Sequence, residues 1–120
     1  MPRNRKIYMD PWDAMYNRLF SATKKRKKKI NVKITKEEFI NISIQNCFYC
    51  GAKPAIEPRW HKNRNIKRNT IDRIDSQKDY EIENCVAACF QCNFAKMDYD
   101  IEEFKKHILN IYNFMKDKNE

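Results

Sequence analysis

Apolar residues recur every three or four positions near both ends of the chain, the spacing of one face of an α-helix. The recurring residues are Trp12, Met15, Tyr16, Leu19 and Ala22 near the N-terminus, and Ile101, Phe104, Ile108, Ile111 and Met115 near the C-terminus. Asp10-Pro11 and Asp100 precede these sets and suit helix starts. We therefore predict helices from Asp10 to about Lys25 and from Asp100 onward, and we assign Trp12, Phe20, Phe104 and Tyr112 to the core.

The pattern changes several times in the middle of the chain. Apolar and polar residues alternate over 30–35, which predicts a short strand. Thr35-Lys36-Glu37-Glu38 has the form of a capping box and predicts a helix start. The stretches 69–75 and 82–88 predict two strands of a hairpin, and a further helix is expected from 89–93 to about Met97. Residues 53–70 show no period and predict a loop.

A chain of 120 residues fits one domain, and its 42% apolar content argues against wholesale disorder. No run of 18 apolar residues exists, so we expect no transmembrane helix and no membrane partner. No apolar segment follows the basic N-terminus, so we expect no secretory signal. The expected location is intracellular: cytoplasmic, or nuclear in a eukaryotic host.

The net charge of +9 is unevenly distributed and indicates a polyanionic partner, most simply duplex DNA. Residues 1–36 carry a net charge of +10, and residues 53–73 carry +5. The first segment contains the run 24–29, which can contact DNA, act as a nuclear localisation signal or simply be a solvated helix end; we favour DNA contact. The candidate DNA-contacting residues are Lys24, Lys25, Arg26, Lys27, Lys28, Lys29, Arg59, His61, Lys62, Arg64, Lys67 and Arg68.

Four of the five cysteines form two C-x2-C pairs. These are Cys47 with Cys50 and Cys89 with Cys92, with 38 residues between the pairs. Two such pairs supply four thiolates in the tetrahedral arrangement of structural zinc. A redox pair would need only one C-x2-C, so we predict a zinc site. The fifth, Cys85, lies on an expected strand and is interpreted as a buried apolar residue.

The stretch from Asn69 to Lys96 lies between and around these cysteines. It resembles the HNH endonucleases, the zinc-containing ββα-metal nucleases of phages, large DNA viruses and mobile introns. The resemblance covers Cys47 to about Asp98 and depends on the four cysteines, Asp72, Asn84 and Asn93. It implies an α+β fold with a treble-clef-like ββα-metal core, one structural Zn²⁺, and N- and C-terminal flanking helices.

The resemblance also implies roles for single residues. Asp72 and Asn93 would hold a catalytic Mg²⁺ or Mn²⁺, and their hard oxygen ligands suit such an ion. Asn84 would brace the hairpin loop and orient the catalytic strand. Lys96, one turn beyond Asn93, is expected to hold a DNA phosphate.

The sequence departs from this family where the general base is expected. The family has His after the aspartate, whereas this chain has Arg73, which stays protonated at neutral pH. One possibility is that another group activates the water, such as Asp75, Tyr80, His61 or a metal-bound hydroxide. Alternatively, Arg73 clamps the scissile phosphate, or catalysis has been lost. We expect Arg73 on the phosphate of an active enzyme.

These observations lead to one functional hypothesis with an alternative. We expect a basic N-terminal helix or arm over residues 1–36 and an HNH-like zinc nuclease domain over 37–120, in one compact unit. The hypothesis is a monomeric DNA endonuclease that nicks its substrate with a divalent metal and no small-molecule cofactor. The alternative is a catalytically degenerate, zinc-dependent DNA-binding module.

Overall fold

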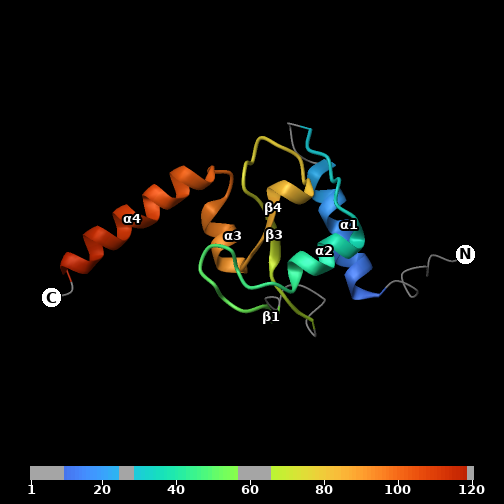
Figure 1. Cartoon of the computed structure of the whole chain (residues 1–120), viewed down its shortest axis with the longest axis horizontal. Coiled ribbons are helices and arrows are strands. Elements are labelled where there is room, and N and C mark those ends of the chain that lie inside the picture. The colour runs from blue at the N-terminus through green and yellow to red at the C-terminus, as the bar shows by residue number, and fades with distance from the viewer. Residues whose placement is uncertain (1–9, 25–28, 57–65, 119–120) are drawn as a thin grey trace, which may run out of the picture.

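The computed structural model describes residues 10–24, 29–56 and 66–118, and combines helices with two small antiparallel sheets (Figure 1). The helices are α1 (Pro11–Lys24), α2 (Lys36–Ser43), α3 (Phe90–Lys96) and α4 (Ile101–Lys118). The strands are β1 (Ala55–Ile56), β2 (Lys67–Arg68), β3 (Thr70–Arg73) and β4 (Cys85–Ala88). No helix in these three described segments is long and apolar enough to cross a membrane.

The centre of the fold is a ββα unit formed by β3, β4 and α3. Strands β3 and β4 pair antiparallel, with Asp72 opposite Val86, so the predicted hairpin is confirmed. α3 follows β4 after a single residue and contacts both strands. This order brings the hairpin and α3 together, so that the candidate metal-binding residues of β3 and α3 lie close to each other.

The hydrophobic core joins the N-terminal segment to the hairpin. Nine buried residues form it: Met15, Ile30, Ile34, Phe39, Ile42, Ile71, Tyr80, Cys85 and Ala87. Phe39 of α2 packs against the rings of Trp12 and Tyr16 of α1. The capping box at Thr35 has both of its hydrogen bonds, with Thr35 Oγ1 accepting from the Glu38 amide at 3.1 Å. Together, these contacts hold α1 and α2 against the hairpin.

Three local expectations were wrong. Residues 30–34 form no strand: only Val32 makes a bridge, to Tyr80, and Ile30 and Ile34 are buried in the core outside any strand. Residues 82–84 form a 3-10 turn instead of the beginning of the second strand. The expected loop contains the short strands β1 and β2, which pair antiparallel with Ala55 opposite Arg68.

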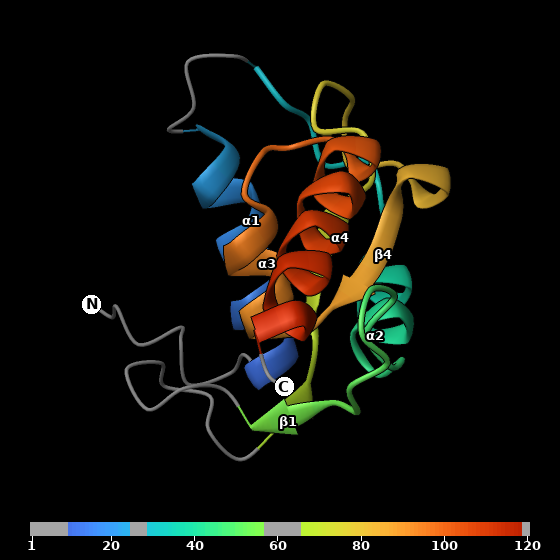
Figure 2. The same ribbon diagram turned by 90° about the vertical axis from the view of Figure 1, so that its left-hand side faces the viewer.

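The last helix also differs from expectation. Helix α4 begins after Asp100, whose carboxylate accepts from the Glu103 amide at 2.8 Å, as predicted. Phe104 is buried against the ring of Tyr49. Tyr112, which we assigned to the core, is 60% exposed. Figures 1 and 2 show why: α4 leads away from the ββα unit, with its C-terminal end farthest out.

Cys85 offers a direct test of the core. Its side chain is buried within β4, as the sequence predicted, and burial raises the pKa of its thiol to about 12. The reactive thiolate is therefore scarce below that pH in the folded chain. We expect iodoacetamide at pH 8 to leave Cys85 unmodified in the zinc-loaded protein and to alkylate it after denaturation, as measured by peptide mass spectrometry. Rapid native alkylation at pH 8 would contradict this placement.

Candidate metal centres

The two C-x2-C pairs meet at one point. The Sγ atoms of Cys47, Cys50, Cys89 and Cys92 all lie within 4.8 Å of one another. Cys50 and Cys89, from different pairs, have their sulfurs 3.7 Å apart. Four thiols converging from two turns match the donor set and geometry of a closed zinc site. The cysteines are free of disulfides, as metal ligands must be.

Backbone amides around the first pair prepare the thiolate form. The amides of Tyr49 and Cys50 donate to the Cys47 sulfur at 3.4 and 3.5 Å. Burial acts against ionisation of Cys47, but amide hydrogen bonds from its neighbours outweigh burial and lower its pKa to about 7. Gly51 closes this turn at φ +78°, a left-handed conformation that favours glycine. The turn at 47–50, called the knuckle below, therefore favours cysteine thiolates that can bind a cation.

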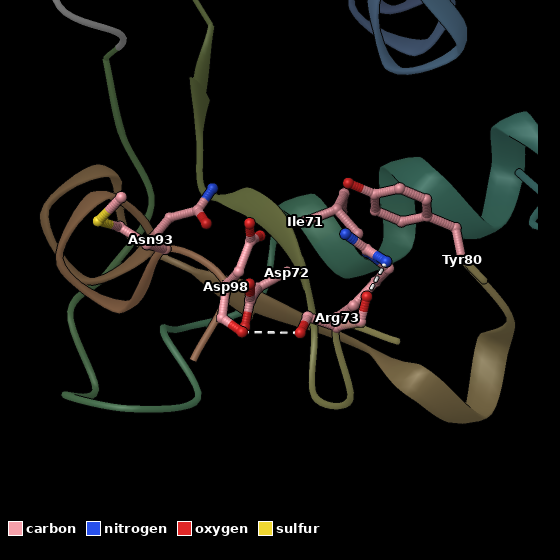
Figure 3. A pocket seen from close by; sticks show the side chains of 8 residues that line it. Ile71, Asp72, Arg73, Tyr80, Asn93 and Asp98 are labelled. Atoms are coloured by element: carbon pink, nitrogen blue, oxygen red, sulfur yellow. Dashed lines mark hydrogen bonds between the residues drawn. The ribbon is translucent and has the colours of Figure 1, made fainter. Parts of the chain in front are cut away.

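A second potential metal centre lies in a hollow of about 100 Å³ beside the hairpin. Its lining includes Asp72 from β3, Asn93 from α3 and Asp98 from the turn that follows α3. Figure 3 shows the side chains of Asp72 and Asn93 pointing into this space from opposite sides. The two residues expected to hold a catalytic ion, which are 21 positions apart in the sequence, therefore share one small polar cavity.

Thr70 fixes the orientation of the Asn93 amide. Its hydroxyl donates to the Ala88 carbonyl at 2.6 Å, so its oxygen can only accept a second bond. Asn93 Nδ2 fills that position at 2.8 Å. The amide nitrogen is thereby tied to the strand, and the Asn93 oxygen remains as the group available to a hard cation such as Mg²⁺.

The Asp72 carboxylate is held by two partners. Its Oδ2 accepts from the Tyr49 hydroxyl at 2.5 Å and lies 3.3 Å from Lys96 Nζ. Asp72 is 6% exposed and Lys96 is completely buried. Burial, reinforced by the hydrogen bond to Asp72, raises the pKa of Tyr49, so the phenol remains a donor at neutral pH. Asp72 therefore lies in a fixed position, between the zinc knuckle and α3.

This arrangement changes the role expected for Lys96. A side chain with no exposed surface cannot meet a DNA phosphate in this conformation. Its ammonium group instead contacts Asp72 and donates to the Arg73 carbonyl at 3.1 Å. Lys96 balances the charge of a buried carboxylate.

Arg73 was expected to contact the scissile phosphate, but its side chain points away from Asp72 and Asp98 in the hollow. Figure 3 shows its guanidinium group on the side of β3 opposite Asp72, against the Tyr80 ring. It donates to the carbonyls of Ser76 and Lys78 at 2.6 and 2.9 Å. Arg73 is 5% exposed and fastens the hairpin loop, so its geometry does not fit a phosphate clamp.

Asn84, at the end of the 3-10 turn that precedes β4, closes the same loop from its other side. Its side chain accepts from the Asp75 amide at 2.9 Å and donates to the carbonyls of Asp75 and Asp79 at 3.0 Å each. These are bracing contacts of the kind that the family resemblance implies. Asp75, one candidate for activating water, instead accepts from the Gln77 amide and caps the turn.

The expected DNA-contacting residues have different surroundings. Lys24, Lys29 and Lys67 are exposed. Arg68 is 7% exposed, stacks over the Phe90 ring and donates to its neighbour's carbonyl, so it also supports the fold. The remaining candidates lie outside the described residues: Lys25, Arg26, Lys27, Lys28, Arg59, His61, Lys62 and Arg64.

Two residues that organise the site were not foreseen. Tyr49 lies inside the first C-x2-C pair and Thr70 inside an expected strand, and neither was given a role in the site from the sequence. Their spacing from Asp72 and Asn93 carries no pattern, because the contacts depend on how the knuckle and the hairpin pack. The one hint of a role for Thr70 was its hydroxyl group, which can bond to the backbone of the paired strand at Ala88.

The ββα unit, the four-thiol site and the adjoining polar hollow together define the HNH-type fold. No family model matches the chain. The chain is similar in structure to the rare-cutting HNH restriction endonuclease PacI, with a TM-score of 0.57 and 24% identity over 79% of this chain and 72% of that one. The expected α+β HNH fold is therefore confirmed, and its four clustered cysteines could hold a metal ion such as zinc.

The chain is also similar in sequence to a viral protein. It is the uncharacterized protein R423 of Acanthamoeba polyphaga mimivirus, with 36% identity over 83 residues. The matched part covers 69% of this chain, and the chain spans only about 14% of the length of that protein.

Proposed function

We propose that this chain is a metal-dependent DNA endonuclease that nicks one strand at a time. The observation that carries the proposal is the meeting of Asp72 and Asn93 in one polar hollow beside the four-cysteine site. The HNH endonuclease PacI, which shares the fold, supports the same class of activity.

The donor set in the hollow fits a hard divalent cation. Asp72 offers a carboxylate oxygen, and Asn93 offers the amide oxygen that Thr70 leaves available. A bound Mg²⁺ or Mn²⁺ would polarise the scissile phosphate and stabilise the leaving oxygen. Tyr49 and Lys96 would hold Asp72 in place throughout, and Asn84 and Arg73 would keep the hairpin loop closed.

The proposed substrate is duplex DNA. The net charge of +9 favours a polyanion, and exposed Lys24, Lys29 and Lys67 are available for backbone phosphates. The basic segments outside the described residues remain part of this proposal. Each phosphate that a cation neutralises should contribute about −0.9 to the slope of log affinity against log salt concentration.

A second candidate, a DNA-binding module without nuclease activity, is favoured by one observation. Arg73 occupies the position of the usual base and is committed to the loop carbonyls. No histidine lines the hollow among the described residues. Such a module would need the charge and the zinc site but not Asn93.

Plasmid nicking by the zinc-loaded protein distinguishes the two candidates. We expect supercoiled plasmid to become open circles with Mg²⁺ or Mn²⁺. Asn93→Ala should reduce the rate by at least about 10–100-fold, the loss typical for partners that only support a metal ligand. Asn41→Ala on the exposed face of α2 is the matched control and should cut normally. Intact plasmid at protein excess, together with retained low-salt DNA binding in a gel-shift assay, would favour the binding module.

A further inference from the structure

The hollow beside the hairpin lacks a proton acceptor at the position where one was expected. Hydrolysis of a phosphodiester is faster when a nearby side chain removes a proton from the attacking water. Arg73 stands at that position, and a guanidinium group cannot accept a proton at neutral pH. Its side chain also points away from Asp72 (Figure 3). A nuclease with this site therefore needs a proton acceptor from another position.

Most of the side chains that line the hollow can be excluded from this role. Asp72 is committed to its two partners and to the proposed ion. Tyr80 is 7% exposed, with its ring centroid 5.0 Å from the guanidinium carbon of Arg73. The Ser76 hydroxyl donates its own proton to a backbone carbonyl at 2.7 Å. The apolar and amide side chains are not bases. Among the described residues that line the hollow, one carboxylate is left, that of Asp98.

Asp98 combines a suitable group with access to water. It lies in the turn between α3 and α4, it lines the hollow together with Asp72 and Asn93, and it is exposed. Figure 3 shows Asp98 on the same side of β3 as Asp72, opposite the Arg73 guanidinium. A carboxylate oxygen there can accept a hydrogen bond from a water molecule and then take its proton.

Two hydrogen bonds connect the backbone of Asp98 to the hairpin loop. Ser76 Oγ donates to the Asp98 carbonyl at 2.7 Å, and Arg73 Nη1 donates to the Ser76 carbonyl at 2.6 Å. Arg73 therefore holds the loop segment to which Asp98 is anchored. A general base has to lie within hydrogen-bond reach of the proton that it removes, so an anchored backbone suits this role.

We propose that Asp98 is the general base of the nuclease reaction, an inference that rests on the proposed function. The Asp98 carboxylate takes a proton from a water molecule while the oxygen of that water forms a bond to the scissile phosphorus. The bond between phosphorus and the leaving oxygen breaks, and the leaving oxygen takes a proton from solvent. Asp98 then returns its own proton to solvent. Ser76 and Arg73 are positioning residues for this step.

Asp98→Asn tests the role with a side chain of the same shape that cannot take the proton. In single-turnover plasmid nicking by the zinc-loaded protein, we expect a rate loss of about 100-fold or more. The affinity of the same protein for Mn²⁺, measured by calorimetry, should stay close to that of the wild type, because Asp72 and Asn93 hold the ion. Glu83→Gln is the matched control. It removes one exposed carboxylate from the 3-10 turn before β4, and it should nick normally.

A small carboxylate from solution provides a second test. Asp98→Ala leaves space where the side chain was, so formate should restore part of its nicking rate, and chloride at the same ionic strength should not. Ser76→Ala removes the anchor but keeps the base. It should lose less of the rate than Asp98→Asn and should gain nothing from formate.

Failure of this inference differs from failure of the proposed function. If the wild type nicks and Asp98→Asn nicks at the same rate, Asp98 is not the base and the nuclease proposal stands. Recovery of Asp98→Asn at saturating Mn²⁺ would make Asp98 a metal ligand and would equally overturn the inference. A rate loss in His61→Ala without one in Asp98→Asn would assign the proton transfer to His61, which lies outside the described residues. A wild-type protein that leaves the plasmid intact would overturn both proposals.

Discussion

Loss of zinc should unfold the ββα unit. The four thiols join the turn at 47–50 to the beginning of α3, two segments that contribute no residue to the buried hydrophobic core. Zinc binding by small four-ligand sites is worth about 10–16 kcal/mol at neutral pH, more than the whole stability of many domains. We expect chelation to abolish the cooperative unfolding transition seen by circular dichroism, and added Zn²⁺, but not Mg²⁺, to restore it.

Two Cys→Ala variants separate metal binding from packing. Cys50 is exposed, whereas Cys85 is buried in the core. If burial determined stability, Cys85→Ala would be the more damaging change. Since we assign Cys50 to zinc, Cys50→Ala should lose the metal and the folded state, and Cys85→Ala should keep one zinc per chain and lose about 1 kcal/mol. Equal zinc content in the two variants, measured by atomic emission, would contradict the assignment.

The sequence predicted those parts of the fold that depend on local chemistry. The capping box at Thr35, the Asp100 helix start and the cysteine pairs each need only a few neighbouring residues, and the structure contains all of them. The prediction of a strand at 30–34 was wrong because alternating apolar and polar residues show only that one side of a segment is buried. They do not show that a partner strand exists. Val32 has a single bridge, while its apolar neighbours Ile30 and Ile34 belong to the buried core.

Longer-range properties could not be read from the sequence in the same way. Lys96 and Arg73 look like the other cations of a basic chain, and only the fold shows that both are buried and bonded to carbonyls or to Asp72. Tyr112 belongs to a helix that does have an apolar face, as its spacing predicted. Periodicity shows that a helix has an apolar face, but not whether the covering surface belongs to the same chain.

Apart from the four cysteines, the ion pair between Lys96 and Asp72 should be among the most costly contacts to break by mutation. Lys96→Met would leave the Asp72 carboxylate in a nearly dry site, and Asp72→Asn would leave a completely buried ammonium group without its counter-charge. Removal of one partner from a buried pair costs about 3–5 kcal/mol. We expect each single variant to lose about that much stability in urea unfolding of the zinc-loaded protein.

The double variant and a surface pair provide the controls. Asp72→Asn with Lys96→Met removes both charges, so its loss should be well below the sum of the two single losses. Lys33→Met breaks an ion pair of similar length with Asp79, at 3.2 Å, but Lys33 is 55% exposed. That change should cost far less stability than either core variant, because solvent screens the pair. Additive losses in the double variant would show that the two groups do not act as a pair.

The same cycle separates catalysis from folding. A nuclease assay on Asp72→Asn alone is ambiguous, because loss of activity could follow from the unpaired Lys96 instead of from the missing ligand. In the double variant the charge imbalance is gone while the metal-ligating carboxylate is still absent. We therefore expect the double variant to recover stability without recovering nicking, whereas full recovery of nicking would remove Asp72 from the proposed metal site.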